Sequence, residues 1–222
     1  MKNKSSVLVT LVTKDYLEHA KQMFSSAYFN GGWDGDFMIL AYDIPDEKLS
    51  WFYNKGFFVK HRPPLYQYDI KKLGWSHFFL TKFYLFEEDM KKWDKVVYID
   101  TDCVVRASLS KMTKVKTIAA VPFFHVNESV SFQNKTIQAK DLFMGGAFSF
   151  DTSLIDTNTF NDLLKITDDL YREVPKGAHN MGNEEIVYKK YFGDKFEKLP
   201  MIFNAIPLFI QEVFQIKEKD VK

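Results

Sequence analysis

The hydrophobic positions at the start of the chain follow first a strand pattern and then a helix pattern. Residues 6–13 (SVLVTLVT) form a short, nearly continuous apolar run, which is typical of a β-strand covered on both faces. Residues 16–28 then place apolar side chains at the spacing of one helical face. The Asn-Gly-Gly triplet that ends at Gly32 is a stop signal, so we predict a strand followed by a helix that ends near residue 30.

The same alternation continues for another thirty residues or so. Apolar runs at 37–42 and 57–59 predict two further strands, and residues 45–55, ended by Gly56, predict a short helix between them. Together these elements make a β-α-β-α-β pattern. The proline-containing stretch 62–74 predicts a loop.

Beyond this loop one strand signal stands out. Ser76 can cap a helix that runs to about Met90, and residues 95–99 (KVVYI) are short, β-branched and bounded by turn signals. The pattern after Ile99 is weaker. It predicts strands at 117–121 and 146–150 and helices at 153–171 and 184–192.

Strands that alternate with helices predict a single-domain α/β fold with a mostly parallel central sheet and helices on both faces. A chain of 222 residues can bury one sizeable core, and nothing in its composition requires a second. Ligands of such folds bind beyond the carboxyl ends of the strands. We therefore expect Thr13, Asp100 and Asp102 to share one rim of the sheet.

The composition narrows the classes of function and location. Thirty Lys and Arg against 29 Asp and Glu leave a formal charge of +1, which disfavours nucleic acid as a partner. The longest apolar runs are shorter than the ~20 residues that cross a bilayer, so no transmembrane segment is expected. The lone Cys103 rules out an internal disulfide framework, and a cytoplasmic setting fits best.

Two acids interrupt the apolar segment that follows residue 97. Asp100 and Asp102 are two apart, so in an extended segment their carboxylates point to the same side, and like charges so close favour a bound cation. Mg²⁺ binds through one or two carboxylates plus substrate phosphates, and Mn²⁺ accepts the same ligands. The alternative hypothesis is that Asp100 caps a turn and Asp102 pairs with a basic side chain such as Arg106.

The residues around this pair also match a family pattern. Residues 93–102 read WDKVVYIDTD, and in them the chain resembles glycosyltransferase family 8, the glycogenin and galactosyltransferase group with the GT-A fold. Further similar segments are 9–13 (VTLVT) with Tyr16, 80–86 (LTKFYLF), 144–150 (MGGAFSF), 182–185 (GNEE) and 199–204 (LPMIFN).

The resemblance implies one glycosyltransferase domain over residues 1–222. Its nucleotide-binding half would be 1–105, its donor-sugar and acceptor half 106–216, and 217–222 a tail. The implied function is metal-dependent transfer of a hexose or deoxyhexose from a UDP-sugar, such as UDP-glucose, to a saccharide or glycan acceptor. Mn²⁺ or Mg²⁺ would neutralise the departing diphosphate as a Lewis acid.

The resemblance also assigns roles to individual residues. The cation is expected on Asp100 and Asp102, and Lys82 is expected to contact the diphosphate or the donor sugar. The other implied donor-binding residues are Leu11, Thr13 and Tyr16 at the uracil and ribose, Thr101 beside the cation and diphosphate, and Gly145 and Gly146, where the backbone approaches the sugar. The implied catalytic residues are Glu184, Lys82 and Asn183.

The chain departs from the family pattern in three places. Asn183 and Glu184 replace an Asp-Gln pair, Gly145 replaces an asparagine, and no His-Gly-Lys-Pro-Trp motif follows Asn204. We therefore expect either a truncated or single-domain version of the family or water in the third metal position, and His125 or His179 are further candidates for that position. Because Glu184 or Glu185 can serve as a general base, both retaining and inverting transfer stay open.

Ordinary structural roles stand beside these assignments. A lysine at position 82 can extend its ammonium to solvent from a helix face, and Asn183 and Glu184 suit the first turn of a helix. Tyr66, Tyr68 and Trp75 can stack on a sugar or line the core. Two other functions stay open: a sugar nucleotidyltransferase, although no glycine-rich loop follows Thr13, and a non-catalytic module that binds nucleotide sugars.

Overall fold

The computed structural model describes residues 5–65, 78–123, 129–132, 135–138, 142–172, 184–193 and 196–205. The described residues up to Arg62 form the predicted alternation of three strands and two helices, and β4 follows further along the chain. These elements are β1 (Ser6–Val12), α1 (Leu17–Phe29), β2 (Asp36–Tyr42), α2 (Ser50–Asn54), β3 (Phe58–Arg62) and β4 (Lys95–Ile99). The glycine stops act as expected, since Gly32 and Gly56 have φ angles of 62° and 74° just after α1 and α2.

One sheet of seven strands, in the order β3-β2-β1-β4-β8-β5-β9, forms the centre of the molecule. The strands β1 to β4 run parallel, and β8 is antiparallel to both of its neighbours. The remaining strands are β5 (Ala119–Pro122), β8 (Phe143–Asp151) and β9 (Glu197–Lys198), with a separate two-stranded pair of β6 (Ser129–Phe132) and β7 (Lys135–Gln138). The mostly parallel α/β fold predicted from the sequence is confirmed.

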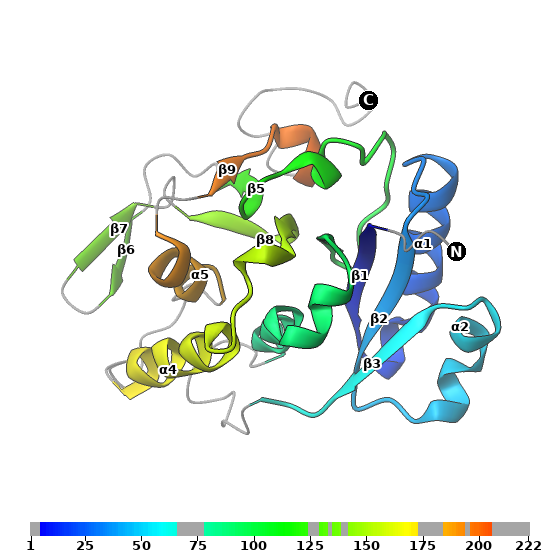
Figure 1. Ribbon diagram of the computed structural model, residues 1–222, viewed down its shortest axis with the longest axis horizontal. Helices are drawn as coiled ribbons and strands as arrows, with labels where there is room; N and C mark the ends of the chain where they lie inside the picture. Colours follow the sequence, from blue (N-terminus) through cyan, green and yellow to red (C-terminus); the bar gives the residue numbers. More distant parts are fainter. Residues whose placement is uncertain are drawn as a thin grey trace.

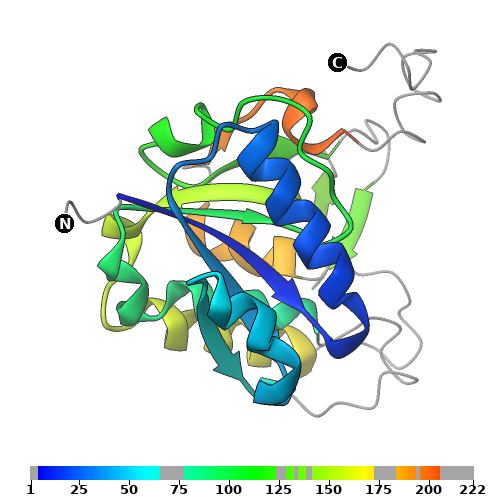
Figure 2. The same ribbon diagram turned by 90° about the vertical axis from the view of Figure 1, so that its right-hand side faces the viewer.

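Helices cover both faces of this sheet, as Figures 1 and 2 show. Along β1, Val7, Val9 and Leu11 pack in one core cluster while Leu8 and Val12 pack in the other, because successive strand residues point to opposite faces. The helices α1 and α2 contribute to the second cluster. The first cluster includes side chains of the remaining helices, α4 (Thr159–Arg172) and α5 (Glu184–Phe192).

The helix predicted from Ser76 to Met90 is wrong in form. Two 3₁₀ segments, η3 (Phe79–Phe86) and η4 (Glu88–Lys92), occupy the described part of this stretch, and Ser76 lies outside the described residues. The helical course breaks at Glu87, whose backbone is extended (φ −75°, ψ 152°). The Glu87 carboxylate pairs with Lys60 and Arg62 of β3, so tertiary ion pairs accompany the break.

One other prediction needed adjustment, and three strands were not predicted. The helix expected from residue 153 begins only at Thr159, because the Asp156 carboxylate accepts bonds from the backbone N–H groups of Asn158 and Thr159 and starts the helix there. The strands β6, β7 and β9 were not predicted.

Short 3₁₀ turns complete the described elements: Lys14–Tyr16, Asp46–Leu49, Met112–Lys114, Thr152–Leu154 and Met201–Asn204. Within the described ranges, no helix is long and apolar enough to cross a membrane.

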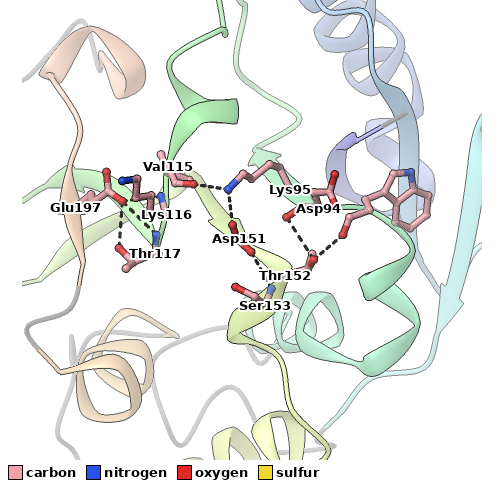
Figure 3. Close-up of polar contacts among 10 residues, drawn as sticks. Asp94, Lys95, Val115, Lys116, Thr117, Asp151, Thr152, Ser153 and Glu197 are labelled. Carbon is pink, nitrogen blue, oxygen red and sulfur yellow. Dashed lines mark hydrogen bonds and ion pairs between the residues drawn. The ribbon is translucent and has the colours of Figure 1, made fainter. Parts of the chain in front are cut away.

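A polar network ties the sheet together at the amino end of β4, as Figure 3 shows. The Lys95 ammonium donates to the carboxylate of Asp151, at the end of β8, and to the backbone carbonyl of Val115. The Asp151 carboxylate also accepts from the N–H of Ser153 at 2.9 Å. These contacts hold the antiparallel pair β4–β8 in register at the edge opposite the carboxyl end of β4.

We expect Asp151→Asn to lower the free energy of unfolding at neutral pH by about 1–3 kcal/mol, because it removes charge-assisted hydrogen bonds. Burial alone would raise the pKa of Asp151, but the bonds from Lys95 and Ser153 outweigh it and lower the pKa below its ordinary value of 3.8. The contribution of Asp151 is therefore present above that value and is lost as the pH falls through the lowered pKa. Urea titrations from pH 7 down to pH 3 measure this, and a difference from wild type that grows on acidification would contradict it.

Candidate active site

The Asp-x-Asp segment forms a turn directly after β4. The N–H of Asp100 donates to the carbonyl of Gly146 at 2.8 Å, and the N–H of Cys103 donates back to the carbonyl of Asp100 at 3.1 Å. The extended conformation expected for Asp100 to Asp102 is therefore wrong. Regular pairing of β4 with β8 ends at Ile99, and the chain turns away from the sheet at this point.

A cavity of about 860 Å³ opens beside this turn. Asp100 and Asp102 line it from the end of β4, and Gly145 and Gly146 line it from β8. Among the described residues, its other lining includes the segment 103–109, Phe123, Glu185 and residues 202–205. The volume lies within the range of small-molecule sites, about 300–1,000 Å³.

Behind the cavity, Lys82 connects three elements. Its ammonium, on η3, hydrogen-bonds to the Glu184 carboxylate at 2.7 Å and to the Gly145 carbonyl at 2.9 Å, and it lies 3.4 Å from Asp100 Oδ1. A lysine has three N–H donors, so each of them has a protein acceptor within reach. Lys82 is 1% exposed, and contact with a donor substrate, implied by the family resemblance, would require giving up one of these interactions.

The charges around Lys82 do not balance. Burial alone would lower the pKa of Lys82, but the negative charges of Glu184 and Asp100 outweigh it and raise the pKa, so the ammonium stays charged. Burial raises the pKa of Glu184 against the opposing effect of Lys82. Burial, and then the charge of Glu184, raise the pKa of Glu185 to about 8. One lysine thus faces three carboxyl groups, whose combined negative charge exceeds its single positive charge.

Gly145 and Gly146 allow these carboxyl groups to approach the backbone of β8. A Cβ atom at Gly145 would lie 2.5 Å from Glu184 Oε1, and one at Gly146 would lie 3.2 Å from Asp100 Oδ2. The buried oxygens Oε2 of Glu184 and of Glu185 have no hydrogen-bond partner among the described residues. The glycine pair therefore lets acidic oxygens, some of them unpartnered, gather at this end of the cavity.

The residues expected at the uracil and ribose lie on β1 and just after it. β1 and β4 are parallel, so Thr13 and Asp100 follow the carboxyl ends of neighbouring strands. Tyr16 is 47% exposed and its ring contacts that of His19, whereas the Leu11 side chain is buried in the core at 2% exposure. None of the three is part of the described lining of the 860 Å³ cavity.

Asp100 and Asp102 fit a site in which they would hold a cation and substrate phosphates would supply the remaining ligands. Within the described ranges no group of three His, Cys, Asp or Glu residues could hold a metal ion. The contacts of the Asp100 side chain with Tyr98 (2.5 Å) and Lys82 both use Oδ1, which leaves Oδ2 for another ligand. Two carboxylates beside an open cavity match Mg²⁺ or Mn²⁺, which also bind phosphate oxygens and water.

Several sequence-based candidates lie outside the described residues. They are Asn183, His125, His179, Tyr66, Tyr68 and Trp75. Thr101, between the two aspartates, is half-buried. The alternative hypothesis of a pair between Asp102 and Arg106 has no support, because the ion pairs of the described residues do not include Arg106.

Sequence reasoning missed Tyr98 as a residue of this site. Its hydroxyl donates to Asp100 Oδ1 at 2.5 Å, and its ring lies 4.8 Å from the Lys82 ammonium. The spacing of two residues between Tyr98 and Asp100, which puts them on one side of a strand, was an available signal. Asn204 also lines the cavity, close to Gly146, and it ends the segment 199–204 in which the chain resembles the family.

The arrangement of strands and helices is that of the GT-A fold, and comparison with known proteins identifies the family. A family model described as Glycosyl transferase family 8 matches residues 7–221. The chain belongs to this family. A comparison with curated protein sequences found no match.

Solved structures of similar fold are also glycosyltransferases. An active-site mutant of LgtC superposes with a TM-score of 0.71 at 16% identity, over 95% of this chain and 78% of that one. The galactosyltransferase LgtC in complex with donor and acceptor sugar analogs gives 0.67 at 13% identity, with the same coverage of both chains. GlyE from Streptococcus pneumoniae TIGR4 gives 0.62 at 16% identity, over 96% of this chain but 50% of its own length. The chain thus spans about half of GlyE, and the likeness shows the fold.

We expect Lys82→Met to lower the free energy of unfolding by about 3–5 kcal/mol, because it leaves buried carboxylates without their cation. The double variant Lys82→Met with Glu184→Gln should be more stable than the sum of the single changes predicts, because the amide carries no charge. Urea denaturation of the three variants measures this coupling.

A matched control is Lys21→Met, which breaks an ion pair with Glu18, a carboxylate that is 81% exposed. This change should alter the stability by no more than about 1 kcal/mol. Strictly additive effects at Lys82 and Glu184 would show that the two side chains do not depend on each other.

Proposed function

We propose that this glycosyltransferase moves a hexose or deoxyhexose from a UDP-sugar to a saccharide acceptor in the cavity beside Asp100 and Asp102. The observation that carries the proposal is the position of these aspartates. They line a cavity at the carboxyl end of β4, at the point of the sheet where α/β folds bind their ligands. The LgtC structure with donor and acceptor sugar analogs, which shares this fold, supports the choice of substrates.

In this proposal Asp100 and Asp102 hold Mn²⁺ or Mg²⁺ against the diphosphate, and Thr101 lies next to them. When bound, the cation supplies a Lewis acid that neutralises the charge of the departing nucleoside diphosphate. The side chains of this chain provide the frame. Tyr98 and Lys82 contact one carboxylate oxygen of Asp100 and hold the other toward Gly146.

The sugar would occupy the end of the cavity at Gly145 and Gly146. The bond from the anomeric carbon to the diphosphate oxygen breaks, and its electron pair leaves with UDP. A bond forms from the same carbon to the acceptor hydroxyl oxygen, and the hydroxyl proton passes to a carboxylate. Glu184, held by Lys82, is our candidate for this role, with Asn183 beside it in sequence, and Glu185 is the neighbouring carboxyl that lines the cavity.

The uridine would lie toward the end of β1, beyond the cavity itself. Thr13 and the exposed ring of Tyr16 are the proposed contacts. Because the Leu11 side chain is buried, its contribution there is limited to its backbone groups.

We expect Asp102→Asn to lower kcat/KM for transfer from a UDP-sugar by about 10²–10³-fold or more, because the cation that stabilises the leaving group is lost. Mn²⁺-dependent binding of UDP, measured by calorimetry, should weaken in parallel. Asp102 is exposed, so the melting temperature should stay close to that of wild type.

Asp34→Asn is the matched control, because Asp34 is an exposed carboxylate that precedes the amino end of β2, and the cavity lies at the carboxyl end of the parallel strand β4. This variant should transfer sugar at the wild-type rate. Full activity of Asp102→Asn would refute the assignment of the cation site.

A thermal-shift panel of sugar nucleotides with and without Mn²⁺ tests the donor. A ligand at a hundred times its Kd stabilises the native state by about 2.7 kcal/mol, which corresponds to roughly 5–10 °C for a chain of this size. We expect a UDP-sugar with Mn²⁺ to give the largest shift. A larger shift with another nucleotide would contradict the UDP assignment, and binding of a UDP-sugar without release of UDP in the presence of acceptors would indicate a non-catalytic binding module.

A further inference from the structure

One wall of the cavity is formed by residues to which the proposed function assigns no role. Residues 103–109 follow the Asp-x-Asp turn, and all of them line the cavity. Two positions of this wall are anchored to the end of α1. The N–H of Val105 donates to the Ser26 hydroxyl at 2.9 Å, and Asn30 donates to the carbonyl of Val105 at 2.9 Å.

The second anchor lies four residues further along the chain. The N–H of Leu109 donates to the carbonyl of Gly31 at 3.0 Å. The Val105 and Leu109 side chains are 7% and 5% exposed and pack in the core with those of α1. The backbone between these anchors is held at both ends, so a side chain carried there is presented from a fixed position.

Arg106 is the charged residue in this anchored stretch. It is exposed, lines the cavity, and takes part in none of the hydrogen bonds or ion pairs found among the described residues. The acidic side chains that line the same cavity are Asp100, Asp102 and Glu185. The Lys82 ammonium lies 3.4 Å from Asp100 Oδ1, but Lys82 is buried and lies outside the lining.

These observations set a requirement on any anionic ligand of the cavity. The donors of Lys82 already face Glu184, Gly145 and Asp100, and a phosphate group would have to displace one of these acceptors. Arg106 has a guanidinium with five N–H donors and no protein acceptor among the residues described. A guanidinium in this state matches phosphate oxygens, which it can bind in a bidentate manner.

We propose that Arg106, which lines the cavity, is a binding residue for the diphosphate group of the donor. Lys82 then acts as a positioning residue for Asp100 and Glu184. This inference rests on the proposed function for the identity of the ligand. Its chemical content, a pyrophosphate group bound by Arg106, can be tested without any sugar or transfer reaction.

The test is calorimetry of inorganic pyrophosphate and of UDP, each with and without Mn²⁺, on the full chain. Arg106→Gln should weaken both ligands by about tenfold to a hundredfold, as expected for the loss of charge-assisted hydrogen bonds. Arg106→Lys should recover part of the loss, because it keeps the charge without the bidentate geometry. The matched control is Lys111→Gln, which removes an exposed positive charge five residues away that does not line the cavity.

The outcomes separate this inference from the proposed function. If wild type binds UDP and Arg106→Gln binds it equally well, the inference is overturned and the proposed function stands. If pyrophosphate binds through Arg106 but no UDP-sugar does, the inference stands and the donor assignment fails. An equal loss of affinity in Lys111→Gln overturns the inference, because it points to a general charge effect. An unchanged UDP affinity of Arg106→Gln together with a raised KM for the acceptor also overturns it, because that result assigns Arg106 to the acceptor.

Discussion

The site depends on the buried positive charge of Lys82. The Lys82 ammonium is held by the Glu184 carboxylate of α5, the Gly145 carbonyl of β8 and, at ion-pair distance, the Asp100 carboxylate after β4. A buried charge is tolerated only with such partners, and the partners in turn are buried acids that need the cation. Three elements that are distant in sequence are thereby fixed at one point, and the oxygen of Asp100 that faces Gly146 owes its orientation to this contact.

The reversal of strand direction at β8 makes this arrangement possible. Because β8 runs antiparallel to β4, its glycine pair lies beside the end of β4, and Asp100 bonds to the Gly146 backbone. A parallel strand at this position would present its own carboxyl end there. The antiparallel strand instead places two residues without side chains where Asp100, after β4, and the acids of α5 converge. The result is a concentration of negative charge that suits a divalent cation or protons.

Much of the fold could be predicted because the sequence signals for its strands and helices lie within the elements themselves. The apolar run of β1 and the glycine stops after α1 and α2 act within a few residues, and the predicted elements match the structure there. From the residues alone, the site could be predicted only as far as Asp100 and Asp102 at the end of β4, where the cavity lies. The family resemblance added Lys82, Gly145, Gly146 and Glu184, which the structure brings together beside Asp100. The helix break at Glu87 and the burial of Lys82 depend on partners far away in the sequence. From the sequence pattern alone, a lysine on this helix face could equally be buried or extend its ammonium to solvent. The convergence of Lys82 with Glu184 exists only in the folded chain.

The anchoring of residues 103–109 on α1 extends the influence of the site to a helix end outside the described cavity lining. Gly31 is packed so closely that a Cβ atom there would lie 2.6 Å from the carbonyl of Ala27 and 2.9 Å from the Val105 side chain. Any larger residue must push the wall or the helix end. The shape of the cavity therefore depends partly on a helix-terminating turn, and changes in that turn offer a way to alter this shape from a distance.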